Sequence, residues 1–233
     1  MSKNAIILCS GGLDSVTCAY YVKNNLKYEN ITLLFFNYNQ KSLNQERESV
    51  KYCSNSIKSE FKEINLPELH NLSTSLINVS VKINAVNKEN LKDTKEESKK
   101  WYVPCRNLLF LSYASALAES NFIKSNQESD IFIGFKCEGQ DSYPDTTKEF
   151  LLKYNNLIAI SSISKINVLA PLIEHDKEDI ISLAEKMKVP LEKTFSCYSP
   201  KNNIHCGKCL SCALRKQGFY WANIKDKTSY ASN

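Results

Sequence analysis

The sequence lacks a long hydrophobic run. No stretch of its 233 residues approaches the roughly 20 consecutive apolar residues that a membrane-spanning helix needs. Its first residues carry a single lysine and then enter a short apolar segment, which does not resemble a signal peptide. We therefore expect a cytoplasmic protein with no membrane partner.

Internal repeats are also absent, and so is the Gly-Lys-Ser/Thr signature of a Walker A loop. The net charge of +5 permits an anionic partner but does not demonstrate one. No basic stripe with interleaved aromatic residues runs along the chain, so we expect no direct binding to nucleic acid.

Cysteine, in contrast, is plentiful and unevenly spread. Four of the nine cysteines crowd near the C-terminal end, with spacings of nine, three and three residues: Cys197, Cys206, Cys209 and Cys212. Without a secretion signal, metal binding suits this cysteine knuckle (residues 197–212) better than disulfides do. Four thiolates fit a tetrahedral structural zinc site, which would fold a segment too small for its own core. A redox Cys-x-x-Cys pair and a nucleic-acid-binding zinc ribbon are the alternatives.

Short apolar runs alternate with helical patterns along most of the chain. The expected strands are 5–9, 31–38, 61–64, 131–134 and 168–169, and the expected helices are 14–25, 45–57, 107–118, 148–160 and 177–187. This alternation predicts an α/β fold, a doubly wound parallel sheet with crossover helices. We divide the chain into an α/β domain at 1–190 and a C-terminal zinc-binding segment at 191–233 that packs on it.

The alternating pattern fails between residues 66 and 100, a variable insertion within the first domain. Residues 82–100 are rich in Lys, Asn and Glu and contain little apolar surface. We expect a solvated or disordered loop there. The alternative is a lid over an active site, because long loops in compact domains are often functional.

The segment "SGGLDS", Ser10 to Ser15, follows the first expected strand directly. A glycine-rich turn that leads into a helix leaves backbone N–H groups unpaired, and together with the helix dipole these favour a phosphate. Ser10 and Ser15 add hydroxyl donors. Asp14 would repel a phosphate, so we expect it to cap the helix or to hold a magnesium ion that the phosphates share. A plain strand-to-helix turn is the alternative.

"SGGLDS" resembles the pyrophosphate loop, SGGxDS, of the N-type ATP pyrophosphatases, the PP-loop superfamily. The knuckle, with SCY, CGxCxxCxxR and GF, is similar to the C-terminal zinc motif of the 7-cyano-7-deazaguanine synthases, the QueC family. Further segments resemble QueC motifs in the right order: "FNYNQKSLNQER", "YVPCRNLLFLSYASALAE", "IFIGFKCEGQDSYPDTTKEF" and "APLIEHDKEDIISLAEKMKVPLEKTFSCY". The resemblance covers nearly the whole chain except 66–100.

The resemblance implies a Rossmann-like fold of the adenine nucleotide alpha hydrolase type, ATP with Mg²⁺, structural Zn²⁺ and a homodimer. It also implies an ATP-dependent ligase that forms AMP. Such an enzyme adenylates the carboxylate of 7-carboxy-7-deazaguanine and transfers it to ammonia, giving the 7-cyano product through an amide. Adenylation is needed because a carboxylate is a poor electrophile until its oxygen becomes a leaving group.

The resemblance also assigns residues. The ATP contacts would be Ser10, Gly11, Gly12, Leu13, Asp14 and Ser15; the catalytic residues Asp14, Ser15, Arg106 and Lys177; and the substrate contacts Tyr38, Gln40, Arg106, Asn107, Tyr143 and Asp145. Arg106 can neutralise a phosphate or carboxylate with its planar fork, and Asp145 can accept from the N–H edge of a guanine-like base. Their alternatives are a surface arginine and a loop turn, and for Lys177 a solvated helix lysine.

The chain departs from the family motifs at five positions. Asn39 and Cys105 replace glycines, Gly139 replaces an acid, and Thr146 and Thr147 replace a cysteine and an arginine. We expect Cys105 to be a filler rather than a nucleophile, since no histidine lies near it in sequence.

The departures leave the acceptor open. One alternative is a QueC-like enzyme of an antiviral defence operon that conjugates a deazaguanine to another amine, such as a protein N-terminus. A tRNA-modifying pyrophosphatase and a catalytically silent zinc-stabilised binding module are the remaining alternatives.

Overall fold

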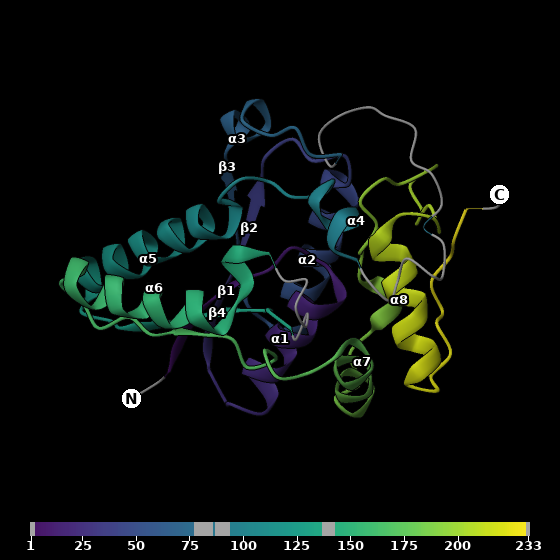
Figure 1. The fold of residues 1–233 in the computed structure, drawn as a ribbon. Coiled ribbons are helices and arrows are strands. Elements are labelled where there is room, and N and C mark those ends of the chain that lie inside the picture. The colour runs from purple at the N-terminus through teal and green to yellow at the C-terminus, as the bar shows by residue number, and fades with distance from the viewer. Residues whose placement is uncertain (1–2, 77–85, 87–93, 137–142, 232–233) are drawn as a thin grey trace.

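Five parallel strands form the central sheet of the computed structural model, which describes residues 3–76, 86, 94–136 and 143–231 (Figure 1). In spatial order β3-β2-β1-β4-β5, the strands are β3 (Glu60–Asn65), β2 (Asn30–Asn37), β1 (Asn4–Leu8), β4 (Ser129–Ile133) and β5 (Val168–Leu169). Strand β1 lies at the centre and pairs with β2 on one side and β4 on the other. This order confirms the predicted doubly wound sheet.

Helices cover both faces of the sheet (Figure 1). One apolar core joins α1 (Leu13–Asn24), α2 (Leu43–Ile57) and α7 (Lys177–Lys186) to strand residues such as Ile7 and Leu33. The other joins α5 (Arg106–Ser125) and α6 (Lys148–Ser161) to residues such as Ile6 and Leu34. Because successive strand residues point to opposite faces, a strand segment that is buried on both sides must be apolar, as β1 is from Ala5 to Leu8.

All ten elements that the sequence pattern predicts are present, and the helix expected at 107–118 extends to Ser125. Helix α8 (Leu210–Trp221) was not predicted; it follows the cysteine knuckle and packs against α7. A glycine inside α8, Gly218, weakens its helical signal in the sequence.

The region predicted to be a loop lies partly outside the described residues. Where it is described it contains two short helices, α3 (Pro67–Asn71) and α4 (Lys95–Lys99), so residues 95–99 are helical rather than irregular. Searching the described residues for a helix long and apolar enough to cross a membrane finds none.

Candidate active site and metal centre

A cavity of about 250 Å³ opens at the carboxyl ends of β1, β2 and β4. This is where ligands bind in doubly wound folds, because the strand order reverses there. Nine of the predicted site residues line it: Ser10, Gly12, Asp14, Ser15, Tyr38, Gln40, Arg106, Asn107 and Tyr143. Segments that are far apart in the sequence therefore meet around one cavity.

The loop between β1 and α1 is held in a conformation that only glycine adopts easily. Gly11 has φ +77°, and a Cβ atom there would lie 2.6 Å from the carbonyl oxygen of Glu46 and 2.9 Å from the Cβ of Ser49. Its own carbonyl accepts from the Ser49 hydroxyl at 2.7 Å and from the Phe195 N–H at 2.8 Å. Hydrogen bonds from α2 and from a segment near the cysteine knuckle therefore hold the loop in place.

Serine hydroxyls brace the inside of this loop. The Ser10 N–H donates to the Ser15 Oγ at 3.2 Å, and the Ser15 hydroxyl donates to the Gly12 carbonyl at 3.1 Å. Helix α1 begins directly after Gly12, so its first N–H groups face the cavity mouth without intrahelical partners. Leu13, in contrast, buries its side chain in the core.

Asp14 and Lys177 form an ion pair at this loop. Lys177 Nζ lies 2.7 and 2.6 Å from the two carboxylate oxygens of Asp14, with 18% and 25% of the lysine and aspartate side chains exposed. The carboxylate therefore turns to Lys177 at the start of α7 instead of capping α1. The pair brings a lysine 163 positions away in sequence to the loop between β1 and α1.

Aromatic and cationic groups form the other wall of the cavity. Phe36 and Phe110 stack with ring centroids 4.0 Å apart, and Tyr38 packs at 5.8 Å from Phe110. Arg106 Nη1 donates to the Tyr38 hydroxyl at 3.4 Å. A flat, partly apolar wall beside a guanidinium suits a planar ring that carries a negative charge. The sequence motifs indicated Arg106 and Tyr38 but not the two phenylalanines.

Asp145 lies behind this wall rather than on it. It is buried, and its Oδ2 accepts the backbone N–H of Asn107 at 3.0 Å, near the start of α5. The rings of Tyr102 and Tyr143 stack on each other beside Asp145, with their centroids 5.6 Å apart. The hydrogen bond to Asn107 anchors the N-terminus of α5, and contact of Asp145 with a base stays a prediction.

A carboxylate that the sequence motifs did not identify, Glu46, also lines the cavity. It accepts from Gln40 Nε2 at 2.8 Å and from the Ser42 hydroxyl at 2.6 Å. Burial raises the pKa of the Glu46 carboxyl, while these two hydrogen bonds and the charge of Arg106 oppose that rise. Glu46 lies within the segment FNYNQKSLNQER that resembles a QueC motif, but that resemblance gave it no role, and the packing of its largely polar helix brings it to the cavity.

Four of the five departures from the family motifs lie among the described residues. Asn39 and Cys105 have φ values of +58° and +52°, the left-handed region that glycine favours. Thr147 caps α6 by accepting from the Phe150 N–H at 3.0 Å. Thr146 lines the cavity, and its hydroxyl donates to the Tyr143 carbonyl at 2.9 Å. The fifth, Gly139, lies outside the described residues.

The four knuckle cysteines converge, with their sulfur atoms all within 4.8 Å of one another. Cys206 and Cys212 sulfurs are 4.0 Å apart, and those of Cys197 and Cys209 are 3.9 Å apart. Tetrahedral zinc with bonds of 2.3 Å would place sulfurs about 3.8 Å apart, so the donor set fits such an ion. The N–H groups of Cys206 and Cys209 donate to the sulfurs of Cys197 and Cys206 at 3.2 and 3.3 Å, which favours thiolates.

Known proteins match nearly the whole length of this chain. A family model described as the queuosine biosynthesis protein QueC matches residues 4–223. A 7-cyano-7-deazaguanine synthase of Methanobrevibacter smithii is 34% identical over 99% of this chain and 99% of its own length. One from Campylobacter jejuni is 39% identical over 100% of each chain. Among solved structures, NMN synthetase from Francisella tularensis has a TM-score of 0.45 at 11% identity, covering 97% of this chain and 79% of its own.

Proposed function

The chain belongs to the QueC family of queuosine biosynthesis proteins, and on that basis we propose that it converts 7-carboxy-7-deazaguanine, ATP and ammonia to 7-cyano-7-deazaguanine. The observation that carries the proposal is the shared cavity. A glycine-rich loop at a helix N-terminus and an aromatic wall with Arg106 meet there, and Asp14 on that loop pairs with Lys177 from α7.

The reaction would proceed by two adenylations. A carboxylate oxygen attacks the α-phosphorus of ATP and pyrophosphate leaves. Ammonia then attacks the acyl carbon, AMP leaves with that oxygen, and loss of a proton gives the amide. The amide oxygen attacks the α-phosphorus of a second ATP and pyrophosphate leaves again; loss of AMP with that oxygen and of two protons from nitrogen then gives the nitrile.

Different residues at the cavity would bind the phosphates and the deazaguanine substrate. N–H groups of Gly11, Gly12, Asp14 and Ser15 and the hydroxyl of Ser10 would hold the departing pyrophosphate, with Mg²⁺ balancing its charge. Lys177 would neutralise the phosphates, and Asp14 would orient Lys177 or hold the magnesium ion. Arg106 would neutralise the substrate carboxylate while the base lies on the Phe36–Phe110 wall.

The cysteine knuckle would hold one structural Zn²⁺. The closed set of four sulfurs, three of them fully buried, leaves no open coordination position for a substrate. Zinc would supply folding free energy to residues 191–233 rather than chemistry.

A mass-spectrometric product assay tests the function. Purified protein with ATP, magnesium, 7-carboxy-7-deazaguanine and ammonium is expected to give the 7-cyano product and AMP. AMP with only amide or adenylate would contradict nitrile formation and direct the search to another amine, such as a protein N-terminus. No AMP with any acceptor would contradict ATP activation altogether.

Two variants make the assay specific to the cavity. Asp14→Ala is expected to lower AMP formation about 100-fold, because it removes from the loop the carboxylate that pairs with Lys177. Glu149→Ala removes a carboxylate from an exposed ion pair on α6, 2.7 Å from Lys153, and is expected to leave turnover unchanged. Equal turnover in Asp14→Ala and the wild type would remove this loop from the mechanism.

A further inference from the structure

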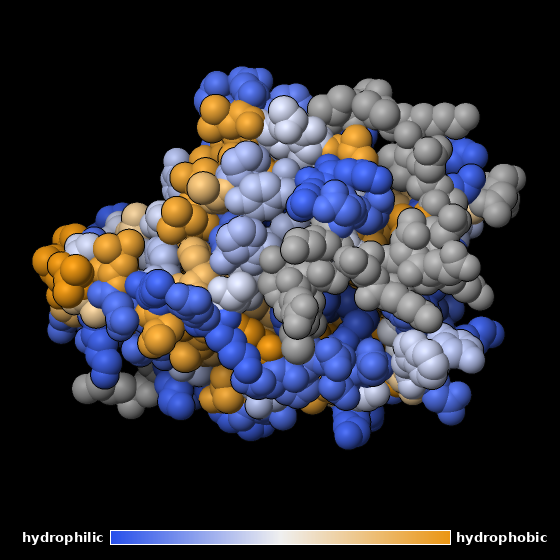
Figure 2. All heavy atoms as spheres, viewed as in Figure 1, coloured by the Kyte–Doolittle hydropathy of each residue, from blue (hydrophilic) through white to orange (hydrophobic). Residues whose placement is uncertain are grey.

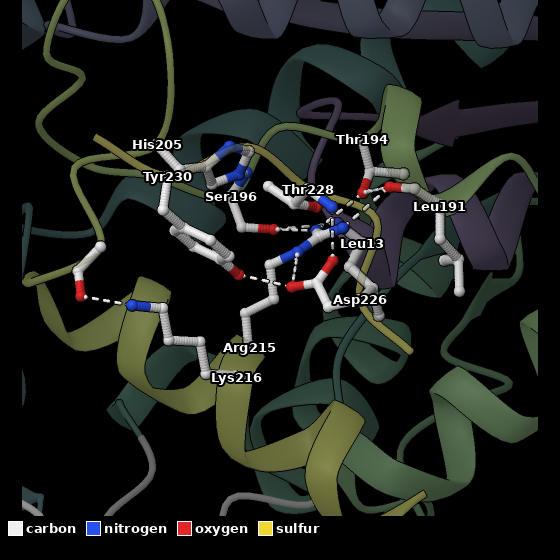
Figure 3. A network of polar contacts seen from close by, with 11 residues as sticks. Leu13, Leu191, Thr194, Ser196, His205, Arg215, Lys216, Asp226, Thr228 and Tyr230 are labelled. Atoms are coloured by element: carbon white, nitrogen blue, oxygen red, sulfur yellow. Dashed lines mark hydrogen bonds and ion pairs between the residues drawn. The ribbon is translucent and has the colours of Figure 1, made fainter. Parts of the chain in front are cut away.

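Arg215, on α8 just after the cysteine knuckle, is fully buried, with 1% of its surface exposed (Figure 3). Its Nη1 donates to the Thr194 and Ser196 hydroxyls at 2.8 and 3.2 Å, and its Nη2 donates to the Leu191 carbonyl at 2.8 Å. Its Nε lies 3.5 Å from a carboxylate oxygen of Asp226. The guanidinium thus holds residues 191–196 from one side.

Ser196 links Arg215 to the loop between β1 and α1. Its Oγ also accepts the backbone N–H of Leu13 at 3.4 Å, and its own N–H donates to His205 Nε2 at 3.1 Å (Figure 3). The preceding residue, Phe195, donates its N–H to the Gly11 carbonyl at 2.8 Å. Two adjacent residues of this segment therefore hold two residues of the loop that faces the cavity.

The hydrogen bond from Leu13 to Ser196 matters because of where Leu13 lies in α1. Leu13 is the first residue of α1, and the N–H groups of the next residues point toward the place where phosphates would bind. A displacement of Ser196 would tilt these donors. Hydrogen-bond donors aimed at a phosphate lose much of their effect when they are misplaced by a fraction of an ångström.

A second set of contacts, through Lys177, connects helix α8 to the same loop. A Cβ atom at Gly218 would lie 2.4 Å from Cγ of Lys177, so the glycine leaves room for the lysine stem. Lys177 in turn pairs with Asp14. The helix that follows the knuckle thus supports the loop through Ser196 and through Lys177.

We propose that Arg215 and Ser196 are positioning residues that set the geometry of the nucleotide loop, linking the cysteine knuckle to ATP binding. The proposal rests on the proposed function in that ATP is the ligand of the loop. Burying a guanidinium costs desolvation free energy that an apolar side chain would avoid, and this positioning role accounts for its presence.

The test compares Ser196→Ala with Ser196→Thr in the metal-loaded full-length protein. Binding of magnesium pyrophosphate is measured by calorimetry, which needs no acceptor substrate, and the KM values for ATP and for the carboxylate substrate are measured by AMP formation. Ser196→Ala is expected to weaken pyrophosphate binding and to raise the KM for ATP roughly five- to tenfold, because the Leu13 N–H and Arg215 both lose their hydrogen bond to this hydroxyl. The KM for the carboxylate and the metal content should stay at their wild-type values.

Two further variants separate positioning from damage to the knuckle. Ser196→Thr keeps a hydroxyl and should bind pyrophosphate within about twofold of the wild type, as expected when the hydrogen bonds persist. Arg215→Lys loses the planar fork and should weaken binding as Ser196→Ala does. Lys216→Ala removes a 3.0 Å bond to the Gly207 carbonyl within the knuckle, and should leave pyrophosphate binding unchanged.

The outcomes distinguish this proposal from the proposed function. Wild-type affinity in Ser196→Ala overturns the positioning role alone. A lower thermal midpoint with unchanged KM values also overturns it, since it shows a purely structural part. A wild-type protein that binds neither ATP nor pyrophosphate overturns the proposed function itself.

Discussion

Single residues show why some departures from the QueC motifs are compatible with the fold. The family has glycine where this chain has Asn39 and Cys105, and both positions have positive φ values, +58° and +52°. Asparagine tolerates the left-handed region well, whereas other residues lose about 1–2 kcal/mol there. These two departures therefore concern backbone strain. Among the described departures, Thr146 is the one that lines the cavity.

Cys105 provides a test of that strain. Cys105→Gly should change the free energy of unfolding by less than about 1 kcal/mol, because relief of strain is offset by the greater entropy of glycine in the unfolded chain. Cys105→Val should destabilise by about 1–2 kcal/mol, since a β-branched residue suits positive φ worst. Urea denaturation measures both. Equal stability of the valine and glycine variants would contradict the strain.

Residues in contiguous motifs could be predicted from the sequence, and residues brought in by packing could not. The loop from Ser10 to Ser15 and the cysteines carry local signatures. The motif for Lys177 indicated the lysine but not its pairing with Asp14, 163 positions away. Glu46 lies in a segment that resembles a QueC motif, but the sequence did not show that its side chain reaches the cavity. Asp145 was recognised, but only the fold shows that it binds the N–H of Asn107.

At the scale of elements, α5 and α6 carry many exposed apolar side chains. Figure 2 shows hydrophobic residues gathered where these helices lie, at the left of the view. The exposed apolar residues of α5 are Leu108, Leu109, Tyr113 and Ile123, and those on and just after α6 are Leu152, Leu157, Ile160 and Ile163. Apolar faces of this kind mark interaction sites, and the family resemblance implies a homodimer, so we propose that a second copy covers this face.

Ile160, 85% exposed, tests this interface. Ile160→Glu should convert the dimer to a monomer, because a stable isologous interface would bury the new charge twice. Leu72→Glu, at a leucine 69% exposed beside α3, is the matched control and should stay dimeric. Size-exclusion chromatography with light scattering reads the mass. A dimer that persists in Ile160→Glu, or a monomeric wild type, would contradict the proposed face.

In the molecule as a whole, the α/β domain and the C-terminal segment meet at the nucleotide loop. The parallel sheet and the helices on both its faces follow from the alternating pattern, which is why they could be predicted; the strand order β3-β2-β1-β4-β5 comes from the structure alone. The docking of α8 against α7 and of residues 194–196 against Gly11 and Leu13 depends on contacts far apart in sequence. These contacts connect the segment beside the cysteine knuckle to the loop that faces the cavity.

Removal of the metal should therefore abolish the response to ATP as well as lower stability. About one zinc per chain is expected, which elemental analysis can measure. In the metal-loaded protein, magnesium-ATP at 100 times its Kd should raise the thermal midpoint by about 5–10 °C. After chelation the midpoint should fall and the ATP shift should disappear, because residues 194–196 would no longer hold the loop. A metal-free chain that keeps the full ATP shift would show that the two sites are independent, and readdition of zinc should restore the shift if they are coupled.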